Sequence, residues 1–152
     1  MKKYRNRVVD SILQEKLEGK GAVLIEGPKW CGKTTTAEQI AKSVLYMDDP
    51  QSKEQNVNMA ALNPKRLLSG ETPRLIDEWQ IAPKLWDAIR FEVDHRDDLG
   101  QFVLTGSAVP PDTKEITHSG TGRFSWLMMI SSGLETRPSM MTSISVRSLS
   151  SS

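Results

Sequence analysis

Residues 27–34 read Gly-Pro-Lys-Trp-Cys-Gly-Lys-Thr, two spaced glycines followed by a lysine and a hydroxyl residue. Such a loop can fold its backbone N–H groups inward, and a helix beginning there adds partial positive charge, so the loop can hold phosphate. Lys33 would reach the β- and γ-phosphates, and the Thr34 hydroxyl would ligate Mg²⁺. The residues expected to contact a nucleoside triphosphate are Gly27, Pro28, Lys29, Trp30, Cys31, Gly32, Lys33, Thr34 and Thr35.

A chance match in a turn rich in glycine and lysine is the alternative interpretation. The apolar run at residues 22–25 predicts a strand before the loop, and residues 35–42 predict a helix after it. A phosphate-binding loop joins a strand to a helix in this way, so the flanking patterns favour the nucleotide site. Lys33 is expected on a solvent-facing part of the loop.

Asp77 and Glu78 are adjacent carboxylates at the end of a predicted strand, residues 74–78. Ligands of open α/β folds bind at the carboxyl ends of the strands. Asp77 can therefore hold the Mg²⁺ that Thr34 also contacts, and Glu78 can orient and polarise an attacking water. This pair suits hydrolysis by water better than transfer to a second substrate. An ordinary solvated turn is the alternative.

Two further residues are candidates for contact with the reacting phosphate. Thr105 ends an apolar strand that is expected between the other two motifs, so its hydroxyl can hydrogen-bond the γ-phosphate or the water. Arg123 follows Gly120-Thr121-Gly122, a glycine-rich segment that could deliver an arginine to the developing phosphoryl charge. A strand-ending turn at Thr105 and a solvated surface arginine are the alternatives.

Apolar patterns along the chain predict the elements that position these residues. A leading amphipathic helix ends near residues 19–21, and strands are expected at 22–25, 43–47, 74–78, 100–105 and 124–130. Helices are expected over 35–42, over 52–69 with a break at Asn63-Pro64, and from Pro83 onward. This alternation predicts an α/β P-loop NTPase fold, a parallel sheet of about five strands flanked by helices.

Composition narrows the class of protein. A chain of 152 residues, of which 38% are hydrophobic, fits one domain. Its net charge of +1 argues against a large surface that binds nucleic acid or an anionic membrane. No apolar run approaches the roughly 18 residues of a membrane span. The single cysteine suits a reducing compartment, so a cytoplasmic location is expected.

Four segments together resemble a known family: Gly-Pro-Lys-Trp-Cys-Gly-Lys-Thr-Thr, Leu-Ile-Asp-Glu-Trp-Gln, Phe-Val-Leu-Thr-Gly-Ser and Gly-Arg-Phe. From about Tyr4 to Leu127 the chain is similar to the predicted AAA-type ATPases of bacteria and archaea, which carry an N-terminal AAA domain and a C-terminal domain of uncharacterised function. The resemblance implies ATP as the nucleotide, a central loop strand with the Asp77 strand beside it in space, and Thr105 in the sensor position. It makes Arg123 a candidate arginine acting in cis or in trans. Gln80 matches a family position for which no role is predicted.

The last residues of the chain depart from the family. We expect an AAA-type nucleotide-binding domain over residues 1–130 and a Ser-rich tail over residues 131–152. The tail has nine serines, one acidic residue and no sustained apolar period, so it is expected to be disordered or poorly packed. Relatives continue further, and the hypothesis is a truncated product whose tail comes from a shifted reading frame.

Three functions stay open from the sequence. The leading one is Mg²⁺-dependent ATP hydrolysis by an AAA-type module of a longer ATPase, acting on a protein or nucleic-acid client. The second is a P-loop phosphotransferase of the kinase type, and the third is a nucleotide-binding module without turnover. This chain alone is expected to hydrolyse ATP slowly, with self-association through AAA-type contacts.

Overall fold

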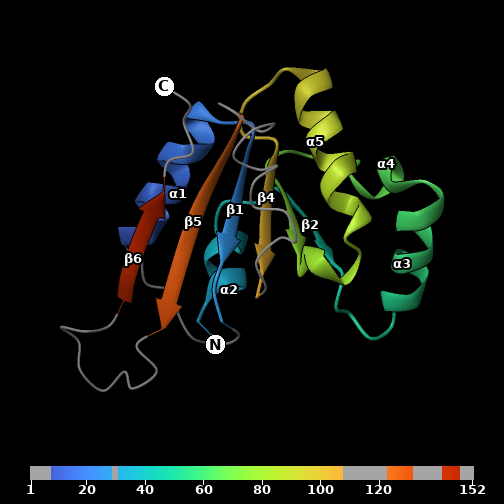
Figure 1. The fold of residues 1–152 in the computed structure, drawn as a ribbon, viewed down its shortest axis with the longest axis horizontal. Coiled ribbons are helices and arrows are strands. Elements are labelled where there is room, and N and C mark those ends of the chain that lie inside the picture. Colours follow the sequence, from blue (N-terminus) through green and yellow to red (C-terminus); the bar gives the residue numbers. More distant parts are fainter. Residues whose placement is uncertain (1–7, 29–30, 108–122, 132–141, 148–152) are drawn as a thin grey trace.

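Strands and helices alternate along the chain (Figure 1). The computed structural model describes residues 8–28, 31–107, 123–131 and 142–147. Helix α1 (Val8–Gly19) precedes strand β1 (Ala22–Glu26), and the loop after β1 leads into helix α2 (Lys33–Glu38). The remaining elements are β2 (Ser43–Tyr46), α3 (Lys53–Leu62), α4 (Pro64–Leu67), β3 (Arg74–Asp77), the 3-10 turn η1 (Trp79–Ile81), α5 (Lys84–Arg96), β4 (Phe102–Gly106), β5 (Phe124–Ser131) and β6 (Thr142–Arg147).

One six-stranded sheet forms the centre of the fold, with the strand order β2-β3-β4-β1-β5-β6. The first five strands in this order are parallel, and β6 pairs with β5 in the antiparallel direction. β1 lies between β4 and β5, so the loop that follows β1 leaves the sheet from an interior strand. The predicted α/β P-loop fold, a parallel sheet of about five strands flanked by helices, is confirmed.

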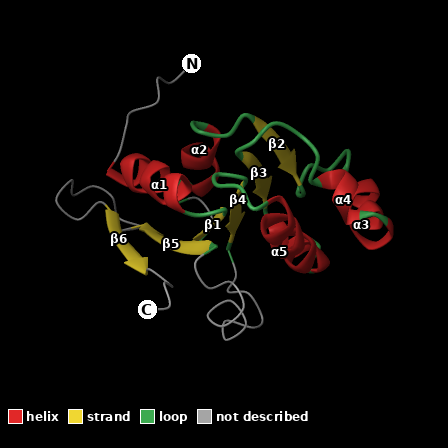
Figure 2. Ribbon diagram, turned by 90° about the horizontal axis from the view of Figure 1, so that it is seen from above, coloured by secondary structure: helices red, strands yellow, loops and turns green. Residues whose placement is uncertain are grey.

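Helices cover both faces of this sheet (Figure 2). The apolar residues of α1 and α2 pack in one cluster with Val23 and Val103. Those of α3, α4 and α5 pack in a second cluster with Leu24 and Leu104. Successive side chains of a strand point to opposite faces, so the fully buried strands β1 and β4 contribute to both clusters. The interior strands are therefore held from two sides.

A helix break at Asn63-Pro64 is also confirmed. Asn63 has φ −155° and ψ 76°, which is not helical, and Pro64 is the first residue of α4. A proline disfavours the helical conformation of the residue before it but fits the first helical position. None of the helices within the described ranges is long and apolar enough to cross a membrane.

The structure corrects one expectation about the sheet. The Asp77 strand does not lie beside the loop strand, because β3 pairs with β2 and β4, and β4 separates it from β1. After β3 the chain crosses over through α5 and returns as β4, and this crossover inserts β4 between the two. The strand that contains Thr105 therefore lies between the two motif-bearing strands, as is expected for that strand from the sequence.

The segment expected to be a disordered tail contains a strand. Residues 142–147 form β6, which is paired with β5 from Trp126↔Arg147 to Ser131↔Thr142. Its sequence, Thr-Ser-Ile-Ser-Val-Arg, alternates polar and β-branched apolar residues over too few positions to stand out beside the serines. Residues 132–141 and 148–152 lie outside the described residues.

Leu104 tests the contribution of the central strand. Its side chain is fully buried in β4, so Leu104→Ala should lower the free energy of unfolding by about 2–5 kcal/mol through lost burial and a residual cavity. The matched control is Leu62→Ala, because Leu62 is 84% exposed at the end of α3 and its truncation should change stability by less than about 0.5 kcal/mol. Urea unfolding of the two variants measures both values, and equal losses would contradict this account of the core.

Candidate nucleotide-binding site

The phosphate-type loop runs from the end of β1 to the start of α2. Gly32 precedes the first helical residue with φ 93° and ψ 15°, a left-handed conformation that glycine adopts without strain. This turn places the N-terminus of α2, with its unpaired N–H groups, at the carboxyl edge of the sheet. Of the other predicted loop contacts, Gly27 N–H donates to the Gly106 carbonyl (3.2 Å), Cys31 is half-buried, and Thr35 lines the cleft that follows the loop. Lys29 and Trp30 lie outside the described residues.

Lys33 is buried, contrary to the expectation that it faces solvent. Only 4% of it is exposed, and its Nζ donates to the backbone carbonyl of Pro28 at 2.9 Å. The ammonium therefore lies folded over the loop rather than in water, because a buried charge needs a polar partner. The positive group is held directly over the loop that would receive phosphate.

Asp77 joins the loop helix to two strands through hydrogen bonds. The hydroxyls of Thr34 and Thr105 donate to the same Asp77 oxygen, Oδ1, at 2.6 and 2.7 Å. Asp77 is 7% exposed and Thr105 is fully buried. Each hydroxyl has one proton, and a carboxylate can only accept, so both protons are committed to Asp77. The lone pairs of the Thr34 oxygen are not used in this contact.

Glu78 leaves the strand in a strained backbone conformation. Its φ of 59° and ψ of 52° are left-handed, which costs a non-glycine residue about 1–2 kcal/mol. Its N–H donates to the Thr105 hydroxyl at 3.1 Å, which turns the chain out of β3 and into η1. The side chain accepts a hydrogen bond of 2.6 Å from the Gln80 amide. The carboxylate thus stands beside Asp77 but in a different environment.

These residues line one cleft at the carboxyl edge of the sheet. It has a volume of about 500 Å³ and is lined by Gly32, Lys33, Thr34, Thr35, Asp48, Asp77 and Glu78. Asp48 is not among the candidate residues predicted from the sequence. The signal was present, because Asp48 closely follows an apolar strand at the same edge of the sheet, as Asp77 does.

Tyr46 connects strand β2 to helix α2, which follows the loop. The Tyr46 hydroxyl donates to a carboxylate oxygen of Glu38 in α2. That hydrogen bond, with burial and the negative charges of Glu38 and Asp77, raises the pKa of Tyr46 to about 12. The tyrosine therefore stays neutral over the pH range in which most enzymes are assayed. Over that range it attaches the end of β2, beside Asp48, to α2.

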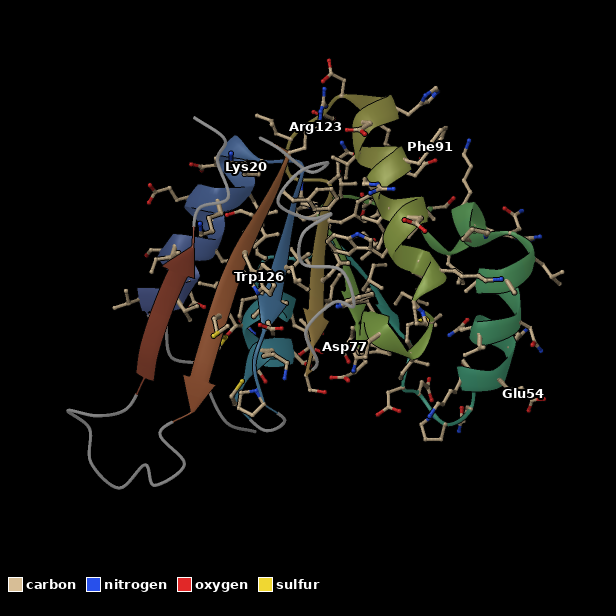
Figure 3. All side chains as sticks on the ribbon, in the orientation of Figure 1. Lys20, Glu54, Asp77, Phe91, Arg123 and Trp126 are labelled. Atoms are coloured by element: carbon tan, nitrogen blue, oxygen red, sulfur yellow. The ribbon has the colours of Figure 1, made fainter. Side chains whose placement is uncertain are left out.

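Arg123 lies at the opposite edge of the sheet from the cleft. It immediately precedes β5, which runs parallel to β1, and its carbonyl accepts from Gly21 N–H (2.9 Å) before the start of β1. Its guanidinium contacts Asp94 (3.1 Å) and Asp97 (2.8 Å). A strand rises about 3.3 Å per residue, so the ends of β1 lie roughly 13 Å apart. Arg123 therefore does not join the other candidates in its own chain, as Figure 3 shows by its separation from Asp77.

Comparison with known proteins gives an independent result. A family model described as an AAA domain matches residues 19–134, which is more than half of the chain. The chain belongs to this AAA-domain family. The match covers the loop, the Asp77-Glu78 pair, Thr105 and Arg123, and membership of an AAA-domain family implies nucleotide binding. No match was found among curated proteins.

Removing the Thr105 hydroxyl tests the hydrogen-bond network around Asp77. Thr105→Val keeps the shape but removes the donor to Asp77 and leaves the Glu78 N–H without its acceptor. We expect a loss of about 1–3 kcal/mol in unfolding free energy, the usual cost of an unsatisfied buried group, and weaker Mg²⁺-dependent nucleotide binding. Urea unfolding and nucleotide-induced thermal shifts, with and without Mg²⁺, measure the two effects.

Thr105→Ser is the matched control, since it keeps the hydroxyl and loses only a methyl group. Its Mg²⁺-dependent thermal shift should remain close to that of the parent. If valine and serine behaved alike in that assay, the hydroxyl would have no part in the site.

Proposed function

We propose that this AAA-domain chain binds ATP with Mg²⁺ and hydrolyses the bond between the β- and γ-phosphates. One observation carries the proposal: Thr34, Asp77 and Thr105 are joined by hydrogen bonds at 2.6 and 2.7 Å, and Lys33 and Glu78 line the same cleft as Thr34 and Asp77. A cation, hydroxyl and carboxylate oxygens and a separate carboxylate are the groups that phosphoryl transfer to water requires.

Binding rests on the loop, Lys33 and the pair of Thr34 and Asp77. Phosphate oxygens would replace the Pro28 carbonyl as partners of Lys33 and would accept from the N–H groups at the start of α2. The Thr34 oxygen and the Asp77 carboxylate are hard oxygen ligands of the kind that Mg²⁺ prefers. The described residues include no group of three or more His, Cys, Asp or Glu that could hold a metal, so the nucleotide would complete the coordination. Bound Mg²⁺ would neutralise charge on the phosphates.

Glu78 is proposed as the general base. It lines the cleft and carries a carboxylate that does not serve the Thr34–Asp77 contact. As water attacks the γ-phosphorus, Glu78 would take its proton, while the bond to the β-phosphate oxygen breaks and ADP leaves. Asp77 would thus bind the metal ion, and Glu78 would activate the water.

Thr105 is proposed to position the two carboxylates rather than to contact phosphate. Its single proton is donated to Asp77, and its oxygen accepts from the Glu78 N–H. A donor that is already committed cannot also stabilise the γ-phosphate. Thr105 therefore determines where both acidic residues stand at the end of the sheet.

A nucleotide-binding module without turnover is the second candidate function. The small number of positive groups that line the cleft favours it. Among the described residues that line the cleft, Lys33 is the one cation. An arginine at the developing charge accelerates such reactions by roughly 10³–10⁵-fold.

We propose that a second copy of the chain supplies this arginine through self-association, with Arg123 as the candidate. Its side chain is about 41% exposed and its two partners are exposed carboxylates, so these ion pairs are weak enough to exchange.

The concentration dependence of turnover separates these two candidates. Phosphate release per chain should be below about 1 s⁻¹ in dilute protein, because no arginine among the described residues lines the cleft. It should rise with protein concentration, and Arg123→Ala should remove that rise without changing ATP binding. Constant slow release at every concentration would support binding without turnover, and fast release in dilute protein would show that one chain suffices.

Glu78 and Asp77 should give different defects when each loses its charge. Glu78→Gln should retain Mg²⁺–ATP binding and lose at least about 10²-fold in hydrolysis, because general bases contribute about that much. Asp77→Asn should instead weaken the Mg²⁺-dependent part of binding. Thermal shifts and phosphate release measure the two properties, with Glu54→Gln on the exposed surface of α3 as the charge control. If the two site variants were indistinguishable in both assays, the proposed roles would be wrong.

A further inference from the structure

We infer that Gln80 is a positioning residue that holds the Glu78 carboxylate and couples it to the end of β4. This inference rests on the proposed role of Glu78 as the base. Gln80 Nε2 lies 2.6 Å from Glu78 Oε2 and 3.4 Å from Ser107 Oγ. A carboxylate only accepts hydrogen bonds, so the amide nitrogen must be the group that faces it.

The local backbone makes this contact possible. Glu78 is left-handed, and the turn η1 that follows is closed by Ile81 N–H donating to the Glu78 carbonyl at 3.1 Å. Trp79 anchors the turn, since it is 1% exposed and its ring lies 5.4 Å from that of Trp86 in α5. The turn is therefore fixed in the core, while Glu78 and Gln80 meet on its other side.

Close packing holds the Gln80 amide in place. A Cβ added to Gly106 would lie 2.8 Å from Gln80 Oε1 and 2.8 Å from Trp79 Nε1, so no side chain fits there without moving them. Gln80 Oε1 is buried and has no hydrogen-bond partner within the described residues. Native proteins seldom leave a buried acceptor unpaired. The amide is thus held in an orientation that favours its nitrogen contact with Glu78 over satisfaction of its own oxygen.

The end of β4 consequently contacts both acidic residues. Thr105 reaches Asp77 directly, and Ser107, two residues later, reaches Glu78 through Gln80. A shift of this strand end would move the proposed base and the proposed metal ligand together. Gln80 is the part of this link that acts on Glu78 alone.

Two substitutions at Gln80 test the link. Gln80→Met keeps the length but removes the donor, so kcat should fall by about 10- to 100-fold, the usual effect of a misplaced catalytic group, with KM and the ATP-induced thermal shift unchanged. Gln80→Glu introduces a carboxyl group at the same place. While that carboxyl group keeps its proton it can donate to Glu78 as the amide does; once both are ionised they repel each other.

The Gln80→Glu variant should therefore lose activity as the pH rises, in contrast to the parent. Across about pH 5–9 its kcat should fall by about tenfold or more, while that of the parent rises or stays level. The other titratable groups that line the cleft are Lys33 from α2, Asp48 after β2 and Asp77 from β3, and all three are unchanged in the variant. Gln55→Glu on the exposed surface of α3 controls for the added charge and should follow the parent profile.

Gly106→Ala is an additional variant, because its methyl group would press on the Gln80 amide and on the Trp79 ring without altering Gln80 itself. It should reproduce the kcat loss of Gln80→Met. The inference is overturned if Glu78→Gln abolishes hydrolysis while the Gln80 variants keep the parent kcat and pH profile, or if the Gln80→Glu profile is lowered equally at every pH. If Glu78→Gln is itself fully active, the proposed base is wrong and the link has no catalytic consequence.

Discussion

The nucleotide cleft depends on two hydrogen bonds that hydroxyl groups donate to one oxygen of Asp77. They come from Thr34 at the start of α2 and from Thr105 at the end of β4. A carboxylate that is 7% exposed is tolerated only when its charge is hydrogen-bonded. The same two contacts therefore satisfy the buried charge and fix the loop helix against the sheet. The position of the Thr34 oxygen beside Asp77 follows from them.

The polarity of the sheet decides which residues can share the cleft. Parallel strands end at one edge, so residues after β1, β2, β3 and β4 converge there although they are far apart in the sequence. Arg123 precedes its strand, so the same polarity places it at the other edge with Asp94 and Asp97. Arg123 of the same chain therefore does not reach the cleft, and Arg123 of a second copy of the chain is the proposed source of an arginine.

Three departures from ordinary local structure occur around Glu78, although others occur elsewhere, such as the left-handed Asp97. Its left-handed backbone, the buried Gln80 oxygen without a described partner and the close approach of Gly106 all occur within one turn and one strand end. Such departures cost stability, and they occur preferentially at functional sites. Their concentration beside the cleft supports Glu78 and Gln80 as a unit whose geometry matters more than its stability.

The sequence by itself determined most of the helices and strands and the motif residues, because apolar periodicity, Pro64 and the glycine loop are local signals. It identified Lys33, Thr34, Asp77, Glu78 and Thr105, and it also predicted that the Thr105 strand lies between the other two. Only the tertiary structure decided that Lys33 is buried, that Asp48 and Gln80 join the site, that Arg123 does not, and that residues 142–147 form a strand. Those outcomes depend on strand order, crossover and side-chain contacts between distant segments, and no local pattern specifies them.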